Sequence, residues 1–185
     1  MKKTLLVYDI EKERKEFLRC IEILKNGGIV VFPTETVYGL GANAFNEVAV
    51  NKIFQAKRRP PDNPLIVHIY SQEFLPFVVK EVNPIAIKLF EFFSPGPLTI
   101  VLPKAESIPY IVTGGLDSVA VRIPSHPVAR EILKLCNFPI AAPSANRSGR
   151  PSPTSFEMAT KEMNGRADAI INGGNCEIGL ESTVV

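Results

Sequence analysis

The chain has 185 residues, the size of one globular domain, and its 45% hydrophobic and 22% charged residues are typical of a globular protein. Its formal net charge is only +2, and no Lys- or Arg-rich tail or block exists, which argues against a large nucleic-acid footprint. No apolar run approaches the roughly 20 residues that span a bilayer, and the N-terminal run is too short for a signal peptide. The three cysteines lie far apart and form no C-x-x-C pair, so neither a disulfide framework nor a structural zinc site is expected. We therefore expect one cytoplasmic domain over residues 1–185, without a membrane partner.

Short apolar runs alternate with helical patterns along the chain. In chain order, the sequence predicts a strand at 4–8, a helix at 11–25, a strand at 29–32, a helix that Asn46 caps and that ends at Lys57, a strand at 65–69, helices at 71–80 and 84–93, strands at 98–102 and 118–123, a helix at 127–136, a strand at 139–143, a helix at 155–163 and a strand at 169–172. Residues 182–185 resemble the start of a further strand, so the sequence is expected to stop short of a natural boundary. This order predicts a single α/β domain around one mixed, twisted sheet flanked by helices.

The common nucleotide and hydrolase motifs are missing. The sequence has no G-x-x-x-x-G-K-[ST] loop, no G-x-S-x-G elbow and no H-E-x-x-H helix. Residues 39–44 (GLGANA) formally match G-x-G-x-x-A, but five residues separate them from Pro33, and the acidic residue expected on a following strand is missing. We therefore favour a tight turn made with glycines over a dinucleotide site.

Polar residues follow two of the predicted elements. The loop after strand 29–32 offers Thr34, Glu35, Thr36 and Tyr38, either for a ligand or as a hydroxyl-rich turn that caps backbone groups. Residues 57–59 (KRR) end a helix, where cations complement the negative helix end. Pro60 and Pro61 fix the backbone beyond them, which is also compatible with a preformed anion clamp.

Two predicted strands each carry one titratable residue among mostly apolar ones. In strand 65–69, alternation places Ile66 and His68 on one face; a lone strand histidine is more often structural than a ligand. In strand 118–123, Arg122 shares a face with Ala120. A buried arginine requires an anionic partner, which could equally be a protein carboxylate or a ligand.

A Ser-, Gly- and Arg-rich loop at 143–155 completes this set, because hydroxyls and exposed backbone N–H groups suit phosphate or ribose oxygens. Together these features predict a cationic pocket for phosphorylated or carboxylated small molecules. They supply no evident nucleophile–base pair or metal-ligand cluster.

Six segments carry a resemblance to a known family: PTETVYGLGA, Lys57-x-Arg59 followed by PxxxPLIVHI, SPGPLTIVLP, VAVRIPSHP, PSAN-x-SG-x-PSPT and ESTVV. Taken in order, from about residue 15 to the last residue, they resemble the YrdC-like family of threonylcarbamoyl-AMP synthases. The joint K-x-R and S-x-N (Ser144-Ala145-Asn146) pattern is the specific part. The resemblance implies a YrdC/RibB-like fold (α/β, or α+β in some schemes) with helices around a deep cationic cavity.

The family resemblance also implies a nucleotidyltransferase reaction. L-threonine, bicarbonate or CO2, and ATP with its Mg2+ would give threonylcarbamoyl-AMP and pyrophosphate, and a separate transferase complex would pass the group to tRNA. Contact with tRNA or double-stranded RNA is a further expectation. The positions that match the family's threonine site are Thr36, His68, Arg122, Ala142 and Ser182. Those on the nucleotide side are Lys57, Arg59, Asn63, Ser118, Ser144, Asn146 and Ser152, with Lys57 and Arg59 also catalytic; no protein-only metal site is implied.

Three alternatives remain open at this level. One is an RNA-binding module of the same fold without catalysis. Another is a carbamoyl-adenylate-forming module like that of hydrogenase-maturation proteins, although the acylphosphatase-like and zinc-finger segments that precede it there are missing from this sequence. A sugar-phosphate lyase of similar fold would need acidic Mg2+ ligands that the motifs do not show. Because the family's longer branch continues past the ESTVV segment with a linker and a second domain, the sequence does not decide between the branches.

Overall fold

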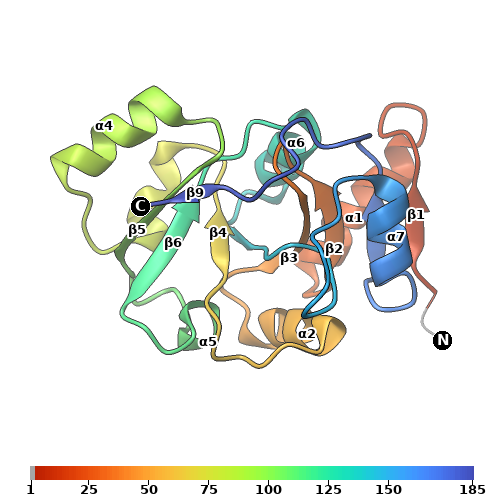
Figure 1. Ribbon diagram of the computed structural model, residues 1–185, viewed down its shortest axis with the longest axis horizontal. Coiled ribbons are helices and arrows are strands. Elements are labelled where there is room, and N and C mark those ends of the chain that lie inside the picture. Colours follow the sequence, from red (N-terminus) through yellow and green to blue (C-terminus); the bar gives the residue numbers. More distant parts are fainter. Residues whose placement is uncertain (1–2) are drawn as a thin grey trace.

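One mixed sheet organises the chain in the computed structural model, which describes residues 3–185 (Figure 1). Within these residues the strand order is β1-β8-β2-β3-β7-β4-β6-β5-β9. The strands are β1 (Leu5–Val7), β2 (Val30–Pro33), β3 (Tyr38–Asn43), β4 (Ile66–His68), β5 (Leu98–Pro103), β6 (Ser118–Arg122), β7 (Ile140–Ala141), β8 (Ala169–Ile171) and β9 (Thr183–Val184). The helices are α1 (Arg14–Lys25), α2 (Glu47–Lys57), the 3-10 helix η1 (Gln72–Phe74), α3 (Leu75–Val78), α4 (Pro84–Phe93), α5 (Tyr110–Thr113), α6 (Pro127–Cys136) and α7 (Phe156–Met163).

The sheet combines parallel and antiparallel pairs, as the sequence predicts. Strand β8 lies parallel to both β1 and β2, and β4–β6 and β5–β9 are further parallel pairs. Between them, β3 and β7 make antiparallel ladders with β2 and β4. Strand β7 therefore joins the two halves of the sheet, although it comes late in the sequence.

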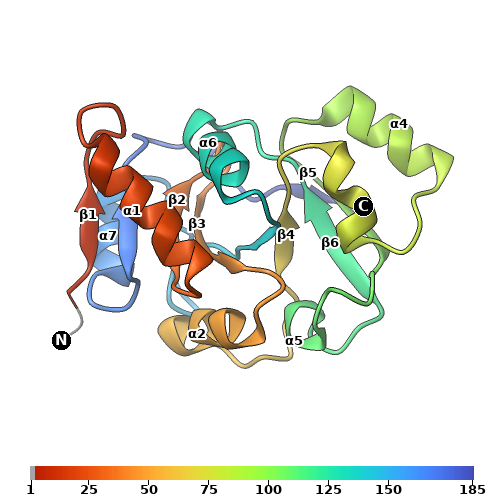
Figure 2. The same cartoon turned by 180° about the vertical axis from the view of Figure 1, so that it is seen from behind.

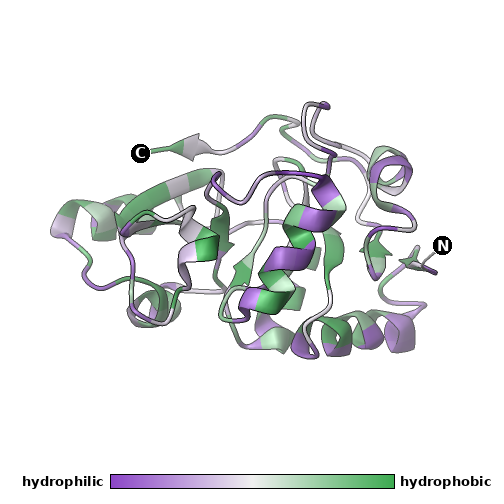
Figure 3. Cartoon of the chain, turned by 90° about the horizontal axis from the view of Figure 1, so that it is seen from below, coloured by the Kyte–Doolittle hydropathy of each residue, from purple (hydrophilic) through white to green (hydrophobic). Residues whose placement is uncertain are grey.

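The sheet separates two apolar cores, because successive strand residues point to opposite faces. Helices α1 and α6 lie side by side over one face (Figure 2), where Phe17 and Ile132 pack with Val30. Val31, the next residue of β2, belongs to the other core together with Phe54 of α2. The helices carry both apolar and polar residues, on different sides of the helix, whereas the strands are largely apolar (Figure 3).

Side-chain caps explain where several helices begin. Asn46 Oδ1 accepts a hydrogen bond from Ala49 N at 3.0 Å at the start of α2, which confirms the predicted cap. At α4, Asn83 Oδ1 accepts from Ala86 N at 2.8 Å, and Pro84 occupies the first turn. Such caps allow a sequence to specify helix starts locally.

The predicted glycine turn is wrong, because Gly39 and Gly41 lie in strand β3, which pairs antiparallel with β2. A Cβ on Gly41 would lie 2.5 Å from Phe32 Cε1 and 2.8 Å from Ile140 Cγ2. Glycine is needed here because neighbouring side chains of the sheet approach the backbone closely.

Three smaller differences concern helices. Helix α1 begins at Arg14 rather than residue 11, since Asp9 Oδ1 accepts from the backbone N–H groups of Glu11 and Lys12 in a turn. The predicted helix 71–80 is reduced to η1 and α3, and residue Val79 turns extended to bridge Lys104. Helix α5 lies in a segment for which no helix is predicted. In residues 3–185, no helix is both long and apolar enough to cross a membrane.

Candidate active site

A cavity of about 210 Å³ lies against the sheet, on the face that carries the side chains of His68 in β4 and Arg122 in β6. Its walls come from the loops after β2 and β7, the segment after α2 and the residues before β9. The lining residues are Thr34, Thr36, Val37, Arg59, Pro64, Ile66, His68, Arg122, Ala142, Pro143, Ser144, Glu181 and Ser182. Alternation along β4 places Ile66 and His68 at this cavity, as predicted, while Val67 belongs to the core.

Arg122, at the end of β6, is a buried charge in the cavity wall. Its Nη2 donates to Glu35 Oε1 at 2.6 Å, its Nη1 to Thr36 Oγ1 at 2.8 Å and its Nε to Gly96 O at 3.2 Å. Both side chains of the Arg122–Glu35 pair are only 4% exposed. Of the two partners that the sequence leaves open for this arginine, the structure contains the protein carboxylate.

Glu35 remains ionised in this pair. Burial by itself raises the pKa of its carboxyl group, but the charge and hydrogen bond of Arg122 oppose that effect. The backbone N–H of Ser125 also donates to Glu35 Oε2 at 3.1 Å, and the net pKa lies below the ordinary value. The ion pair is therefore held by hydrogen bonds to both of its members.

His68 lies beside Arg122, because the two residues are register partners in the parallel pair β4–β6. The imidazole is buried, and its Nδ1 has no hydrogen-bond partner in the described part of the chain. Burial, together with the Arg122 charge, lowers the pKa of His68 to about 3. His68 is therefore a neutral imidazole in the cavity wall, and its Nδ1 is buried.

The loop after β2 is a hydroxyl-rich turn and a cavity wall at once. Thr34 Oγ1 donates to Val37 O at 2.7 Å and lies 2.9 Å from Thr36 Oγ1. Both threonines line the cavity. Across the cavity, Ser182 Oγ lies 2.7 Å from Thr99 Oγ1 of β5.

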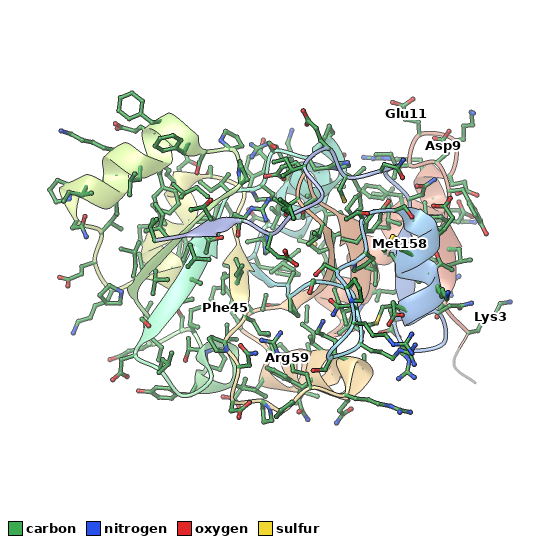
Figure 4. All side chains as sticks on the ribbon, in the orientation of Figure 1. Lys3, Asp9, Glu11, Phe45, Arg59 and Met158 are labelled. Carbon is green, nitrogen blue, oxygen red and sulfur yellow. The ribbon has the colours of Figure 1, made fainter. Side chains whose placement is uncertain are left out.

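The three cations at the end of α2 have different environments. Arg58 is exposed and adopts the left-handed conformation that ends the helix. Arg59, labelled beside α2 in Figure 4, lines the cavity, and its buried Nε has no partner among residues 3–185. Lys57 is buried but does not line the cavity: its Nζ donates to Asn146 O at 2.6 Å and also to Ser144 O.

Burial and the nearby Arg59 charge lower the pKa of Lys57 to about 7. The buried ammonium group of Lys57 therefore loses its proton more readily than that of an exposed lysine. Its contacts tie α2 to the loop after β7, which carries three predicted nucleotide-site residues, Ser144, Asn146 and Ser152.

The loop after β7 is further held by Glu162 of α7, a residue that the sequence analysis missed. Glu162 Oε2 accepts from Arg147 N at 3.1 Å and Nε at 3.0 Å, and Oε1 accepts from Arg150 Nη1 at 2.9 Å. Hydrogen bonds from Arg147, followed by others from the same two arginines, lower the pKa of Glu162 to about 2. Within the loop, Ser144 Oγ donates to Asn146 Oδ1 at 2.5 Å.

The structure brings part of the predicted site together. The lining includes Thr36, His68, Arg122, Ala142 and Ser182 from the predicted threonine side, and Arg59 and Ser144 from the nucleotide side. The predicted residues outside this lining are Lys57, Asn63, Ser118, Asn146 and Ser152. Of these, Asn63 lies next to Arg59, whose Nη2 donates to Asn63 O at 3.4 Å, and Ser152 Oγ donates to Glu181 Oε1 at 2.5 Å.

The sequence offers Glu35 in the loop after strand 29–32, but Glu35 is not among the predicted threonine-side or nucleotide-side residues. The signal was the need of Arg122 for an anionic partner. The sequence could not choose Glu35, because that residue lies 87 positions away from Arg122 in the chain.

Fold and site together define an α/β domain with a mixed sheet and a small polar pocket that contains a buried arginine. The Sua5/YciO/YrdC family model, described as telomere recombination, matches residues 22–185, and the chain belongs to this family. This confirms the family that the motifs predict.

Curated relatives agree with this assignment. The chain is 55% identical over 162 residues to a protein of Pyrococcus abyssi and 49% identical over 164 residues to one of Bacillus subtilis, both named threonylcarbamoyl-AMP synthase. Each match covers 88% of this chain but 48% and 47% of the relatives, so the chain spans about half their length. The crystal structure of P. abyssi Sua5 complexed with L-threonine is similar with a TM-score of 0.93 and 50% identity, over 98% of this chain and 53% of that one.

Proposed function

We propose that the chain forms threonylcarbamoyl-AMP and pyrophosphate from L-threonine, bicarbonate or CO2, and Mg-ATP. The observation that carries the proposal is Arg122, buried at the cavity wall with only three of its hydrogen bonds made to the protein. A guanidinium has five N–H donors, so two are left for a ligand carboxylate. The names of the relatives supply the substrate.

The cavity suits an amino acid. Its volume of about 210 Å³ is below the roughly 300–1,000 Å³ of pockets that hold drug-sized ligands. In our proposal Arg122 binds the threonine carboxylate, while the hydroxyls of Thr36 and Ser182 and the neutral imidazole of His68 contact its polar groups. The backbone at Ala142 borders the same ligand.

In this proposal the nucleotide lies on the side of Arg59 and Ser144. Both residues line the cavity, and they belong to the end of α2 and the loop after β7, which Lys57 connects. The guanidinium of Arg59, a residue of the cavity lining, would contact a phosphate oxygen; its buried Nε has no protein partner within residues 3–185. Lys57 contributes its charge and holds the loop, and Asn63, Ser118, Asn146 and Ser152 border the nucleotide outside the cavity lining.

The chemistry asks for positioning and charge neutralisation. The threonine ammonium group loses a proton to solvent, and the resulting amine attacks the carbon of CO2 and releases a second proton to give a carbamate; bicarbonate first takes up a proton and loses water to give CO2. A carbamate oxygen then attacks the α-phosphorus of Mg-ATP, and the bond to the pyrophosphate oxygen breaks. Arg59 and Lys57 offset the charge that develops on the phosphates. The mixed anhydride formed is labile, and substrates that fill the small cavity would protect it by displacing water.

The direct test is product formation. We expect the 185-residue chain, incubated with Mg-ATP, bicarbonate and isotope-labelled L-threonine, to give a labelled adenylate in the mass spectrum and an equal amount of pyrophosphate. Omitting either threonine or bicarbonate should abolish pyrophosphate release. Pyrophosphate release that does not depend on both substrates, or no adenylate at all, would contradict the proposal.

The product's destination belongs to the same proposal. A separate transferase complex would use the adenylate to modify tRNA, and the reaction would take place in the cytoplasm. The proposal includes direct contact with tRNA or double-stranded RNA. The affinity of the chain for either RNA, measured at several salt concentrations, tests that contact. The family's named relatives do not favour the non-catalytic or hydrogenase-maturation alternatives.

A further inference from the structure

Glu35 stands behind the cavity rather than in it. It does not belong to the cavity lining, yet its carboxylate makes the 2.6 Å contact with Arg122 described above. Its second oxygen accepts from the backbone N–H of Ser125. Both oxygens of this buried carboxylate thus face donors, and neither is directed to a ligand.

The contacts of Glu35 restrict the orientation of Arg122. Together with Gly96 O and Thr36 Oγ1, the carboxylate accepts hydrogen bonds from all three guanidinium nitrogens. A planar guanidinium held at three points cannot rotate, so its two remaining N–H groups have fixed directions. Fixed donors select a carboxylate, which accepts twice, over an amide, whose NH2 group would oppose one donor.

We propose that Glu35 is a positioning and specificity-determining residue, which holds Arg122 so that the site selects a free ligand carboxylate over the corresponding amide. This inference rests on the proposed function, in which Arg122 binds the threonine carboxylate. Glu35 touches no substrate and acts only through Arg122.

The side chain of Glu35 can be changed without removing the backbone contacts of its loop. Ile178 N donates to Glu35 O and Gly179 N to Thr36 O, so the crossing of the C-terminal segment over this loop depends on main-chain groups. A glutamine has one acceptor oxygen and one NH2 group, so Glu35→Gln places a donor against either Arg122 or Ser125. The substitution therefore disturbs the guanidinium while conserving size.

The test compares two ligands by isothermal titration calorimetry, L-threonine and its carboxamide, on the wild type, Glu35→Gln and the control Glu177→Gln. Glu177 is exposed on the segment that crosses the same loop. We expect Glu35→Gln to bind L-threonine roughly tenfold or more weakly, the loss expected when a charge-assisted hydrogen bond is misplaced. The threonine-to-amide affinity ratio should fall towards one, while ATP affinity changes less than about twofold. Glu177→Gln should match the wild type.

Glu35→Asp serves as a second variant if Glu35→Gln does not fold. It keeps the charge but shortens the side chain, so the positioning role predicts weaker threonine binding and a lower ratio here too. An unchanged ratio in the variants, or an equal loss for both ligands, would overturn the proposal and leave the proposed function standing. If the wild type itself does not prefer L-threonine to its amide, the assignment of Arg122 to the substrate carboxylate fails instead.

Discussion

At the scale of single residues, the site is built from buried polar groups whose partners differ in kind. Arg122 is paired with a carboxylate, Lys57 with carbonyl groups, and His68 is neutral. Each solution avoids an isolated charge in the interior. The three residues are therefore expected to fail in different ways when they are replaced.

Lys57→Met should lower the affinity for ATP by roughly tenfold or more, which corresponds to a loss of about 1.4 kcal/mol of binding free energy for each factor of ten. The physical reason is that the substitution removes a cation and frees the carbonyls of Ser144 and Asn146 that set the loop. Calorimetric titration with ATP measures this effect. Threonine affinity in the absence of nucleotide should change less than about twofold, because Lys57 does not line the cavity.

Lys88→Met is the matched control, as Lys88 is exposed on α4. It should leave both affinities unchanged. A loss of threonine affinity in Lys57→Met as large as the loss of ATP affinity would show that the lysine supports the whole site rather than its nucleotide side.

At the scale of elements, the loop between β7 and α7 is the clearest case of order without regular secondary structure. Lys57 holds it from α2 and Glu162 holds it from α7. Asn146 also donates to Arg150 O at 2.6 Å inside the loop. These contacts replace the backbone ladders that would otherwise fix a segment of this length.

Glu162→Ala should therefore weaken ATP binding several-fold and lower the free energy of unfolding by about 1–2 kcal/mol, after allowance for the solvent exposure of Arg150. Urea denaturation measures the second quantity, and titration with ATP the first. Glu157→Ala, at an exposed position of the same helix, is the control and should alter neither. Loss of stability without loss of ATP affinity would mean that the loop's position does not matter for the nucleotide.

The longer helices and most strands could be predicted locally, whereas α5 and β3 were not. Asn46, Asn83 and Pro84 mark helix starts within a few residues of the sequence. Gly39 and Gly41 instead weaken the local preference for a strand, and β3 forms because β2 and β7 pair with it on both sides. Tertiary pairing overrides local preference in that segment.

At the scale of the whole molecule, the sheet gathers residues that are distant in the sequence around one cavity. His68 and Arg122 come from neighbouring parallel strands, and Ser182 precedes the edge strand β9. The buried His68 makes the stability of the entire fold depend on pH. Its pKa of about 3 in the folded state lies below its ordinary value of 6.5.

The free energy of unfolding should therefore fall as the pH is lowered from 6.5, because the unfolded chain binds a proton at His68 that the folded chain does not. The contribution of one histidine is at most about 1.4 kcal/mol per pH unit. Above pH 4.5, the ordinary value for Glu35, that carboxyl group adds little to the slope. Urea denaturation at several pH values between 5 and 7 measures the effect.

His68→Gln should flatten this pH dependence. His126, the only other histidine, is half-buried, and burial lowers its pKa in the same direction, so His126→Gln should flatten it less. An undiminished slope in His68→Gln would show that the acid sensitivity arises from other groups.

The sequence by itself determined the face on which His68 and Arg122 stand, since strand alternation is a local property, and its motifs determined the family. It also determined the cap of α2 at Asn46. Only the tertiary structure decided that Glu35 is the partner of Arg122 and that the amine of Lys57 faces Asn146 rather than the cavity. These contacts join residues 87 and 89 positions apart, and a buried charge accepts whichever partner the fold brings within reach. The need for a partner was therefore evident in the sequence, and the choice of partner was made by the packing of the sheet.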